Sequence, residues 1–227
     1  MNRIYTFIFL LLSNFSFFMA QGQLKDIDEV TYNTVYIGRQ VWTIENSIVT
    51  HFRNGDSIAE AHDLQEWIAA GQERRPAYCY YKFNPDYGRK YGKLYNFFAI
   101  MDVRGFAPPG WHIPHDEDWK MLTDELGGET AAGEKMKATY GWTAVVDKKG
   151  NGSNYSEFSG LPGGFLMFKE GNTGFSNLGY NGFWWSSTAV DSVAEKVWCR
   201  SIGYDQDNLY KIAVNIKSGL SVRFVRD

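Results

Sequence analysis

Alternating apolar and polar residues predict a pair of strands near the start of the chain. Residues 31–43 read TYNTVYIGRQVWT, in which Val35 and Ile37 alternate with more polar neighbours. Gly38 and Arg39 interrupt this alternation before a second short apolar run. A period of two is typical of a strand with one buried face, and glycine favours a turn. We therefore predict two β-strands joined by a tight turn.

Apolar residues spaced three and four positions apart predict helices in three segments. The first runs from Ser57, which caps it with help from Glu60, to Gly71. Its apolar face consists of Ile58, Ala61, Leu64, Trp67 and Ile68. The second covers residues 114–127, where three acidic side chains in the first turn complement the helix dipole. A shorter third helix is expected over residues 131–138.

The remaining segments predict strands and loops. Residues 76–83 are β-rich in type, residues 84–88 form a loop, and the apolar stretch 91–101 belongs to the core as a strand or a short helix. From residue 151 onward, Gly and Asn turns separate short runs rich in Phe, Trp, Val and Ile, which is typical of antiparallel strands. The predicted fold is α+β, with two or three helices packed on short twisted antiparallel sheets connected by long loops.

The first twenty residues have the features of a secretory signal peptide. Arg3 precedes an apolar run over residues 4–12, and Ala20 offers a small residue for cleavage. The alternative is a membrane anchor, but polar residues interrupt a segment already short for a bilayer. We predict a signal peptide over 1–20 and one mature domain over 24–227, located in the periplasm, at the cell surface or in the medium. No membrane span is expected after leader removal.

Charge and cysteine content narrow the classes of partner. The formal net charge is -3 and basic residues occur in pairs at most, which argues against a nucleic-acid partner. The chain has 2 cysteines, Cys79 and Cys199. An exported protein permits a disulfide between them, and two buried thiols are the alternative. The sequence is compatible with a disulfide and with two free thiols.

Several motifs in fixed order resemble the Fibrobacter succinogenes major paralogous domain, a secreted or surface family of Bacteroidetes-type bacteria. The motifs are IGRQVWTIEN at 37–46, YGKLYNFFA at 91–99, PPGWHIPHDEDW at 108–119, LPGG at 161–164, WWSST at 184–188 and GLSVRFVRD at 219–227. The resemblance implies a fold similar to C-type lectin-like domains and to the formylglycine-generating sulfatase-modifying factors.

Two departures from the family pattern coincide. Relatives often carry cysteines where this chain has Ala107 and Phe224. The loss of both fits a disulfide that was deleted as a unit, because a single leftover thiol is reactive in an exported protein. The resemblance therefore predicts that Ala107 and Phe224 are spatial neighbours, with the buried aromatic ring of Phe224 contributing packing instead of a bridge.

Two clusters suggest metal sites, and simpler explanations account for both. His112, His115, Asp116 and Asp118 carry zinc-type ligands, yet a Trp-His turn and the first turn of a helix explain them without an ion. The loop with Asp205, Asp207 and Asn208 could contribute to a structural calcium site. Three side chains fall short of the six to eight oxygens that calcium takes. We expect no metal and no cofactor.

A candidate ligand surface lies in the strand-rich half. Trp184 and Trp185 could stack on a sugar or peptide, and Asn172 and Asn181 could bind its hydroxyl groups. Adjacent strand residues face opposite ways, so only one of the two rings could reach a ligand while the other fills the core. Core packing for both rings is the favoured alternative.

The leading functional hypothesis is a non-catalytic exported module for cell-surface or extracellular architecture, or for binding a glycan or a surface protein. The alternative is an enzyme derived from the formylglycine-generating fold. That chemistry needs reactive thiols, and Cys199 stands alone among the C-terminal strands. No nucleophile elbow, P-loop or His-Glu-x-x-His motif occurs in the sequence.

Overall fold

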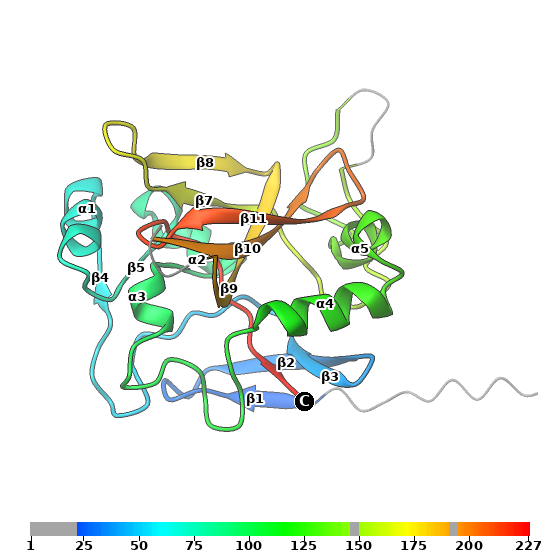
Figure 1. The fold of residues 1–227 in the computed structure, drawn as a ribbon, viewed down its shortest axis with the longest axis horizontal. Helices are drawn as coiled ribbons and strands as arrows, with labels where there is room; N and C mark the ends of the chain where they lie inside the picture. The colour runs from blue at the N-terminus through cyan, green and yellow to red at the C-terminus, as the bar shows by residue number, and fades with distance from the viewer. Residues whose placement is uncertain (1–21, 146–149, 191–194) are drawn as a thin grey trace, which may run out of the picture.

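A mixed α+β architecture is built from five α-helices and four small sheets in the part of the chain that the structure covers (Figure 1). The computed structural model describes residues 22–145, 150–190 and 195–227. The predicted signal peptide lies outside these ranges. Figure 1 shows the N-terminal sheet on one side, the β7–β8 hairpin on the other, and the β9–β11 sheet between them.

The N-terminal sheet joins the two ends of the domain. Its strands, in the spatial order β1-β2-β3-β12, are β1 (Gln23–Lys25), β2 (Thr31–Ile37), β3 (Gln40–Thr43) and β12 (Val225–Arg226). The predicted strand pair over residues 31–43 is confirmed, with Gly38 in the turn at a φ of 61°. Since β12 pairs with Val41 and Trp42 of β3, the same sheet contains both the first and the last strand that the structure describes.

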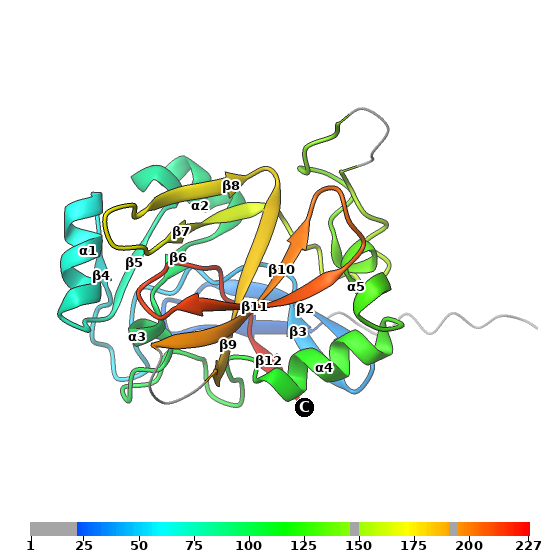
Figure 2. The same cartoon turned by 45° about the horizontal axis from the view of Figure 1, so that its top comes forward.

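Three further sheets come from the middle and the C-terminal half (Figure 2). A three-stranded antiparallel sheet contains β9 (Asn181–Ala189), β10 (Lys196–Gly203) and β11 (Leu209–Asn215), in the order β11-β10-β9. A hairpin contains β7 (Gly163–Met167) and β8 (Gly174–Leu178). A small mixed sheet contains β4 (Ala59–Glu60), β5 (Ala77–Cys79) and β6 (Leu94–Tyr95). Strands β7 to β11 confirm the prediction of a strand-rich C-terminal half.

The helices confirm two of the predicted helical segments, and they are more numerous than predicted. They are α1 (Leu64–Gln72), α2 (Pro85–Tyr91), α3 (Phe97–Ile100), α4 (Asp116–Glu125) and α5 (Glu129–Met136), with a 3-10 turn at Tyr81–Phe83. Helices α4 and α5 match the predictions over 114–127 and 131–138. Within the described ranges there are five α-helices instead of the two or three expected.

The first predicted helix begins six residues later than its pattern indicated, as the positions of the N-caps show. Asp63, not Ser57, is the N-cap, and its carboxylate accepts a hydrogen bond from the Glu66 amide at 2.8 Å. Glu60, the expected partner of a Ser57 cap, instead lies in β4, which pairs in parallel with β5. Pairing with a distant strand therefore overrides the local helical spacing in this segment.

Helix α2 occupies the segment that the sequence predicted as a loop. Asn84 caps it by accepting a hydrogen bond from the Asp86 amide at 2.9 Å, and Pro85 takes the first helical position. Proline fits there because its fixed φ suits a helix and its missing N–H is not needed. The Asn-Pro pair therefore marks a helix start, and the expectation of a loop at 84–88 is wrong.

Asn46 is the meeting point of segments that lie far apart in the sequence. Its Oδ1 accepts hydrogen bonds from Trp184 Nε1 at 2.9 Å and from Arg223 Nε at 2.6 Å. Its Nδ2 donates to the carbonyl oxygen of Tyr91 at 2.8 Å. The side chains of Trp184 and Arg223 are buried, so these bonds lie in a region of weak solvent screening. We call Asn46, Trp184 and Arg223 the Asn46 junction.

The predicted neighbourhood of Ala107 and Phe224 agrees with the packing. Phe224 is fully buried in a cluster against which the half-buried Ala107 packs. The ring of Phe106, next in the chain to Ala107, lies 5.9 Å from the ring of Phe224. An aromatic core thus occupies the place where the resemblance implies a lost disulfide.

Gly92 allows the chain to pass directly against Asn46, which predicts a position-specific effect of adding a methyl group. A Cβ at Gly92, whose φ is 77°, would lie 2.8 Å from Asn46 Cβ. Gly110 is a matched control, since its φ is 78° and nothing lies within 4 Å of a built Cβ. The positive φ should make Gly110→Ala destabilising by about 1 to 2 kcal/mol. We expect Gly92→Ala to lose about 1 to 3 kcal/mol more through overpacking. Urea unfolding measures both, and equal losses would contradict the close approach.

Candidate functional site

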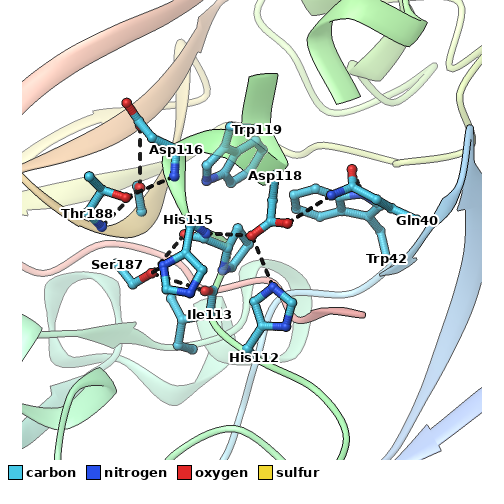
Figure 3. Close-up of polar contacts among 12 residues, drawn as sticks. Gln40, Trp42, His112, Ile113, His115, Asp116, Asp118, Trp119, Ser187 and Thr188 are labelled. Atoms are coloured by element: carbon cyan, nitrogen blue, oxygen red, sulfur yellow. Dashed lines mark hydrogen bonds and ion pairs between the residues drawn. The ribbon is translucent and has the colours of Figure 1, made fainter. Parts of the chain in front are cut away.

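The first turn of α4 is organised by the carboxylate of Asp118. Its Oδ2 accepts from the His115 backbone N–H at 2.7 Å and lies 3.0 Å from His112 Nε2. Its Oδ1 accepts from Gln40 Nε2 at 3.0 Å (Figure 3). Asp118 therefore ties the residue that precedes α4, as expected for His115 at the N-cap, to strand β3. These bonds use both oxygens of the carboxylate.

Ser187 and His115 form a close pair without the third group that a catalytic triad requires. Ser187 Oγ lies 2.6 Å from His115 Nδ1, and also 3.2 Å from the carbonyl oxygen of Ile113 (Figure 3). The imidazole that contacts a carboxylate belongs to His112, which stacks on His115 with ring centroids 5.5 Å apart. Stacked rings do not pass a proton along hydrogen bonds, so Ser187, His115 and Asp118 are not arranged as a relay.

The WWSST segment serves as a dock for the start of α4. Thr188 Oγ1 accepts from the Asp116 amide at 2.9 Å, and the Ser187 amide donates to the Pro114 carbonyl oxygen at 2.8 Å. Trp119 Nε1 donates to the Trp185 carbonyl oxygen at 3.3 Å. This cluster thus has a structural role, and the described residues contain no group of three or more His, Cys, Asp or Glu arranged to hold a metal ion.

A charged hollow of about 380 Å³ lies beside this cluster, between α4, β10 and β11. Asp116 stands at its edge with Arg200 Nη1 2.9 Å from its Oδ1, and Lys211 Nζ close to its Oδ2. Two cations on one carboxylate leave that acid little capacity for another ligand. The hollow is lined mainly by charged residues of both signs, of which Lys120 pairs with Asp124, and Leu209 is its apolar residue.

The ammonium group of Lys137 lies against the loop that the sequence suggested as a calcium site. Lys137 is 1% exposed, and its Nζ donates to the carbonyl oxygen of Gln206 at 2.8 Å and of Gly203 at 3.4 Å. Asp207 Oδ1 lies 3.9 Å from the same nitrogen. Burial lowers the pKa of Lys137, while the charge of Asp207 opposes that change. Lys137 therefore supplies a built-in cation to these loop oxygens.

The four residues predicted to bind a ligand do not form one site. Trp184 and Trp185 are both 0% exposed, so neither ring can stack on a ligand, and the ligand role assigned to them is wrong. The favoured alternative, core packing for both rings, is confirmed, because Trp185 and Trp184 belong to two different core clusters. Trp185 Nε1 donates inward to the Tyr95 carbonyl oxygen at 2.7 Å. Asn172 is exposed in the β7–β8 turn, whereas Asn181 begins β9 at the far end of β8.

Both cysteines are buried as free thiols. Cys79 lies in β5 and Cys199 in β10, and neither forms a disulfide. Burial raises the pKa of Cys199 to about 12 and raises that of Cys79 well above its ordinary value. The sequence allowed either a disulfide or two buried thiols, and the structure shows two buried thiols. Thiols of this kind behave as small apolar residues, because the reactive form is the thiolate.

A second cavity, of about 390 Å³, has the mixed character of a ligand pocket. We call it the Arg223 pocket. Its buried end includes Asn46 and Arg223, and its exposed rim carries Glu45, Arg89, Lys90 and Tyr140. Its apolar walls come from Val30, Ile44, Ile48 and Leu161. Largely apolar walls with a few convergent polar groups are typical of sites for small ligands.

Arg223 is the most unusual group in this pocket. Its side chain is nearly fully buried, with Nη1 donating to the carbonyl oxygens of Thr43 at 2.7 Å and Phe158 at 2.9 Å. No carboxylate of the described residues lies within ion-pair distance of it, and the charge of Glu45 acts from further away. Burial lowers the pKa of Arg223 to about 9. A strongly perturbed group beside a pocket is a candidate for function.

Sequence reasoning missed this pocket, although one signal was present. Arg223 interrupts the apolar run LSVRFV, and a charge within a segment that packs in the core must find polar partners. Its partners, however, come from residues 43, 46, 158 and 159, which no local pattern connects to it. The exposed ring of Tyr140 likewise comes from a loop with no strong motif.

Comparison with known proteins gives one result. The sequence model of the family described as Fibrobacter succinogenes major domain matches residues 35–226. No curated protein and no solved structure matches the chain. The match begins within β2 and ends with β12, and it includes the Asn46 junction and most of the residues that line the Arg223 pocket.

Replacement of Lys137 tests whether its ammonium supplies the charge in the loop at residues 203–207. Lys137→Met should lower the free energy of unfolding by about 1 to 3 kcal/mol, because buried carbonyl oxygens lose their donor. Lys169→Met, at an exposed position, should change it by less than about 0.5 kcal/mol. Urea unfolding with and without excess calcium measures both effects. A rise in the midpoint of the unaltered chain on adding calcium would show that an ion, not Lys137, belongs there.

Proposed function

We propose that this chain, which belongs to the Fibrobacter succinogenes major domain family, is a non-catalytic exported module that binds a glycan in the Arg223 pocket. The observation that carries the proposal is the combination of buried polar groups, apolar walls and one exposed aromatic ring in a single cavity. Tyr140, at 58% exposure, offers an apolar ring face that the core does not use. A sugar ring presents apolar C–H faces and polar edges, and this pocket offers partners for both.

Export and surface location form part of the same proposal. We propose that residues 1–20 are a signal peptide and that the mature domain acts in the periplasm, at the cell surface or in the medium. Among the residues that the structure describes, no helix is long and apolar enough to cross a bilayer. A glycan ligand suits these locations, and a surface protein is the alternative partner.

The proposal includes a more specific fold. We propose that the helices and small sheets form a C-type lectin-like domain, similar to the sulfatase-modifying factors. The pairing of β12 with β3, which brings the ends of the domain together, supports this assignment. Long connections beside the sheets, such as residues 101–115, agree with the loop-rich surface that such domains have.

The rival proposal is an enzyme derived from the formylglycine-generating fold. Such an enzyme requires thiolates that reach a substrate. Cys79 and Cys199 are both 0% exposed and their pKa values are raised by burial, which favours the binding module. Among the described residues, the Ser187–His115 contact favours a hydrolytic alternative, but the hydrogen bonds of both residues to the start of α4 support a structural role.

A glycan array with matched tyrosine variants tests the proposed function. The purified chain should bind at least one oligosaccharide, and Tyr140→Ala should weaken that binding about tenfold or more, as for a central aromatic contact. Tyr155→Ala is the control, because Tyr155 is 77% exposed and does not line the pocket. Calorimetric titration of the array hits gives the affinities. Absence of any glycan binding, or equal effects of the two variants, would refute the proposed function.

A further inference from the structure

The charges around the Arg223 pocket are unbalanced. Its lining contains three cationic residues, Arg89, Lys90 and Arg223, and one acidic residue, Glu45. Glu45 is engaged elsewhere, since its two carboxylate oxygens accept from the backbone N–H of Asn33 at 2.8 Å and from the Asn33 side chain at 2.7 Å. Arg89 pairs with Asp86. Within the described residues, Lys90 and Arg223 therefore remain without an acidic partner.

The guanidinium of Arg223, which lines the pocket, has an N–H group that no short hydrogen bond uses. A guanidinium has five N–H groups. Nε and both hydrogens of Nη1 are directed at Asn46 Oδ1 and at the carbonyl oxygens of Thr43 and Phe158. Nη2 makes one long contact of 3.4 Å, with the carbonyl oxygen of Ser159, which also lines the pocket. Nη2 therefore has the weakest protein contact of the three guanidinium nitrogens, and the partner in that contact, Ser159, belongs to the pocket wall.

A buried cation of this kind favours an anionic ligand. Removing a guanidinium from water without a counter-charge is unfavourable, and a ligand oxygen with negative charge restores the balance. Arginine and lysine N–H groups form their strongest hydrogen bonds with carboxylate and similar anions. Lys90, at the exposed rim, adds a second positive charge on the same cavity.

The remaining walls indicate which anion fits. Ile44, Ile48 and Leu161 provide apolar surface, and Tyr140 provides an exposed ring. A small inorganic anion would leave these groups without contacts, whereas a sugar ring that carries a carboxylate would use both the apolar walls and the cations. The volume of about 390 Å³ is at the lower end of the range for ligand pockets, which suits a single sugar unit of a chain.

We propose that the Arg223 pocket recognises the carboxylate of an acidic sugar residue, which Arg223 Nη2 and Lys90 bind together. This inference rests on the proposed glycan-binding function and specifies the class of its ligand. Asn46 is a positioning residue, because its Oδ1 accepts a hydrogen bond from Arg223 Nε and so holds the guanidinium in place.

The test compares an oligosaccharide of hexuronic acids with the same oligosaccharide after reduction of its carboxylates to neutral hydroxymethyl groups. We expect the acidic form to bind about tenfold or more tightly, which is the effect of one charge-assisted hydrogen bond. Lys90→Glu should abolish that preference. Lys169→Glu, which makes the same charge change at an exposed position outside the pocket, should retain it. Arg223→Lys is measured in parallel after its unfolding transition shows that it folds.

Each outcome separates this inference from the proposed function. Equal affinity for the acidic and the reduced forms, with both weakened by Tyr140→Ala, would overturn the carboxylate inference and leave glycan binding intact. If Lys90→Glu and Lys169→Glu both keep the preference for the acidic form, the carboxylate binds elsewhere. That result would also overturn the carboxylate inference. Glycan-array hits that include no acidic oligosaccharide would have the same consequence. Failure to bind any glycan would remove the proposed function as well.

Discussion

The hydrogen bonds of one buried guanidinium hold this domain together. Arg223, which lies two residues before β12, donates to Thr43 of β3, to Phe158 in the connection between α5 and β7, and to Asn46. Asn46 in turn accepts from Trp184 of β9 and donates to Tyr91 at the end of α2. Because Asn46, Trp184 and Arg223 are buried, loss of any one of these side chains leaves another polar atom unsatisfied. Four of the six sequence motifs, those at 37–46, 91–99, 184–188 and 219–227, therefore meet at the Asn46 junction.

The same junction explains why the molecule has a pocket beside it. Removing a guanidinium from water is unfavourable, and neutral carbonyl oxygens compensate for it only in part. A core that contained only apolar side chains at this position would be simpler to stabilise. In the proposed function, Arg223 has both a structural role and a binding role, because it lines the pocket as well as joining distant segments. The cluster at the start of α4 is accounted for by helix capping and docking.

The sequence predicted those elements whose signals are local. The strand pair at 31–43 and helices α4 and α5 follow from spacing, turn residues and capping, and all are present. The start of α1 and the existence of α2 were missed, because β4 pairs with a strand distant in sequence and because Asn84-Pro85 can open either a turn or a helix. The burial of both Trp184 and Trp185 depends on layers from other parts of the chain. The Arg223 pocket needs residues from at least four separate segments, and no periodic pattern encodes their meeting.

The most direct test of the junction is a double-mutant cycle between Asn46 and Arg223. The free energy of unfolding is measured by urea denaturation for the unaltered chain, Asn46→Ala, Arg223→Met and the double variant. If the two side chains act as one unit, the double variant loses less than the sum of the single losses, with a coupling of about 1 to 3 kcal/mol. Additive losses, within about 0.5 kcal/mol, would show that Arg223 is held independently of Asn46 and would contradict the central place given to their contact.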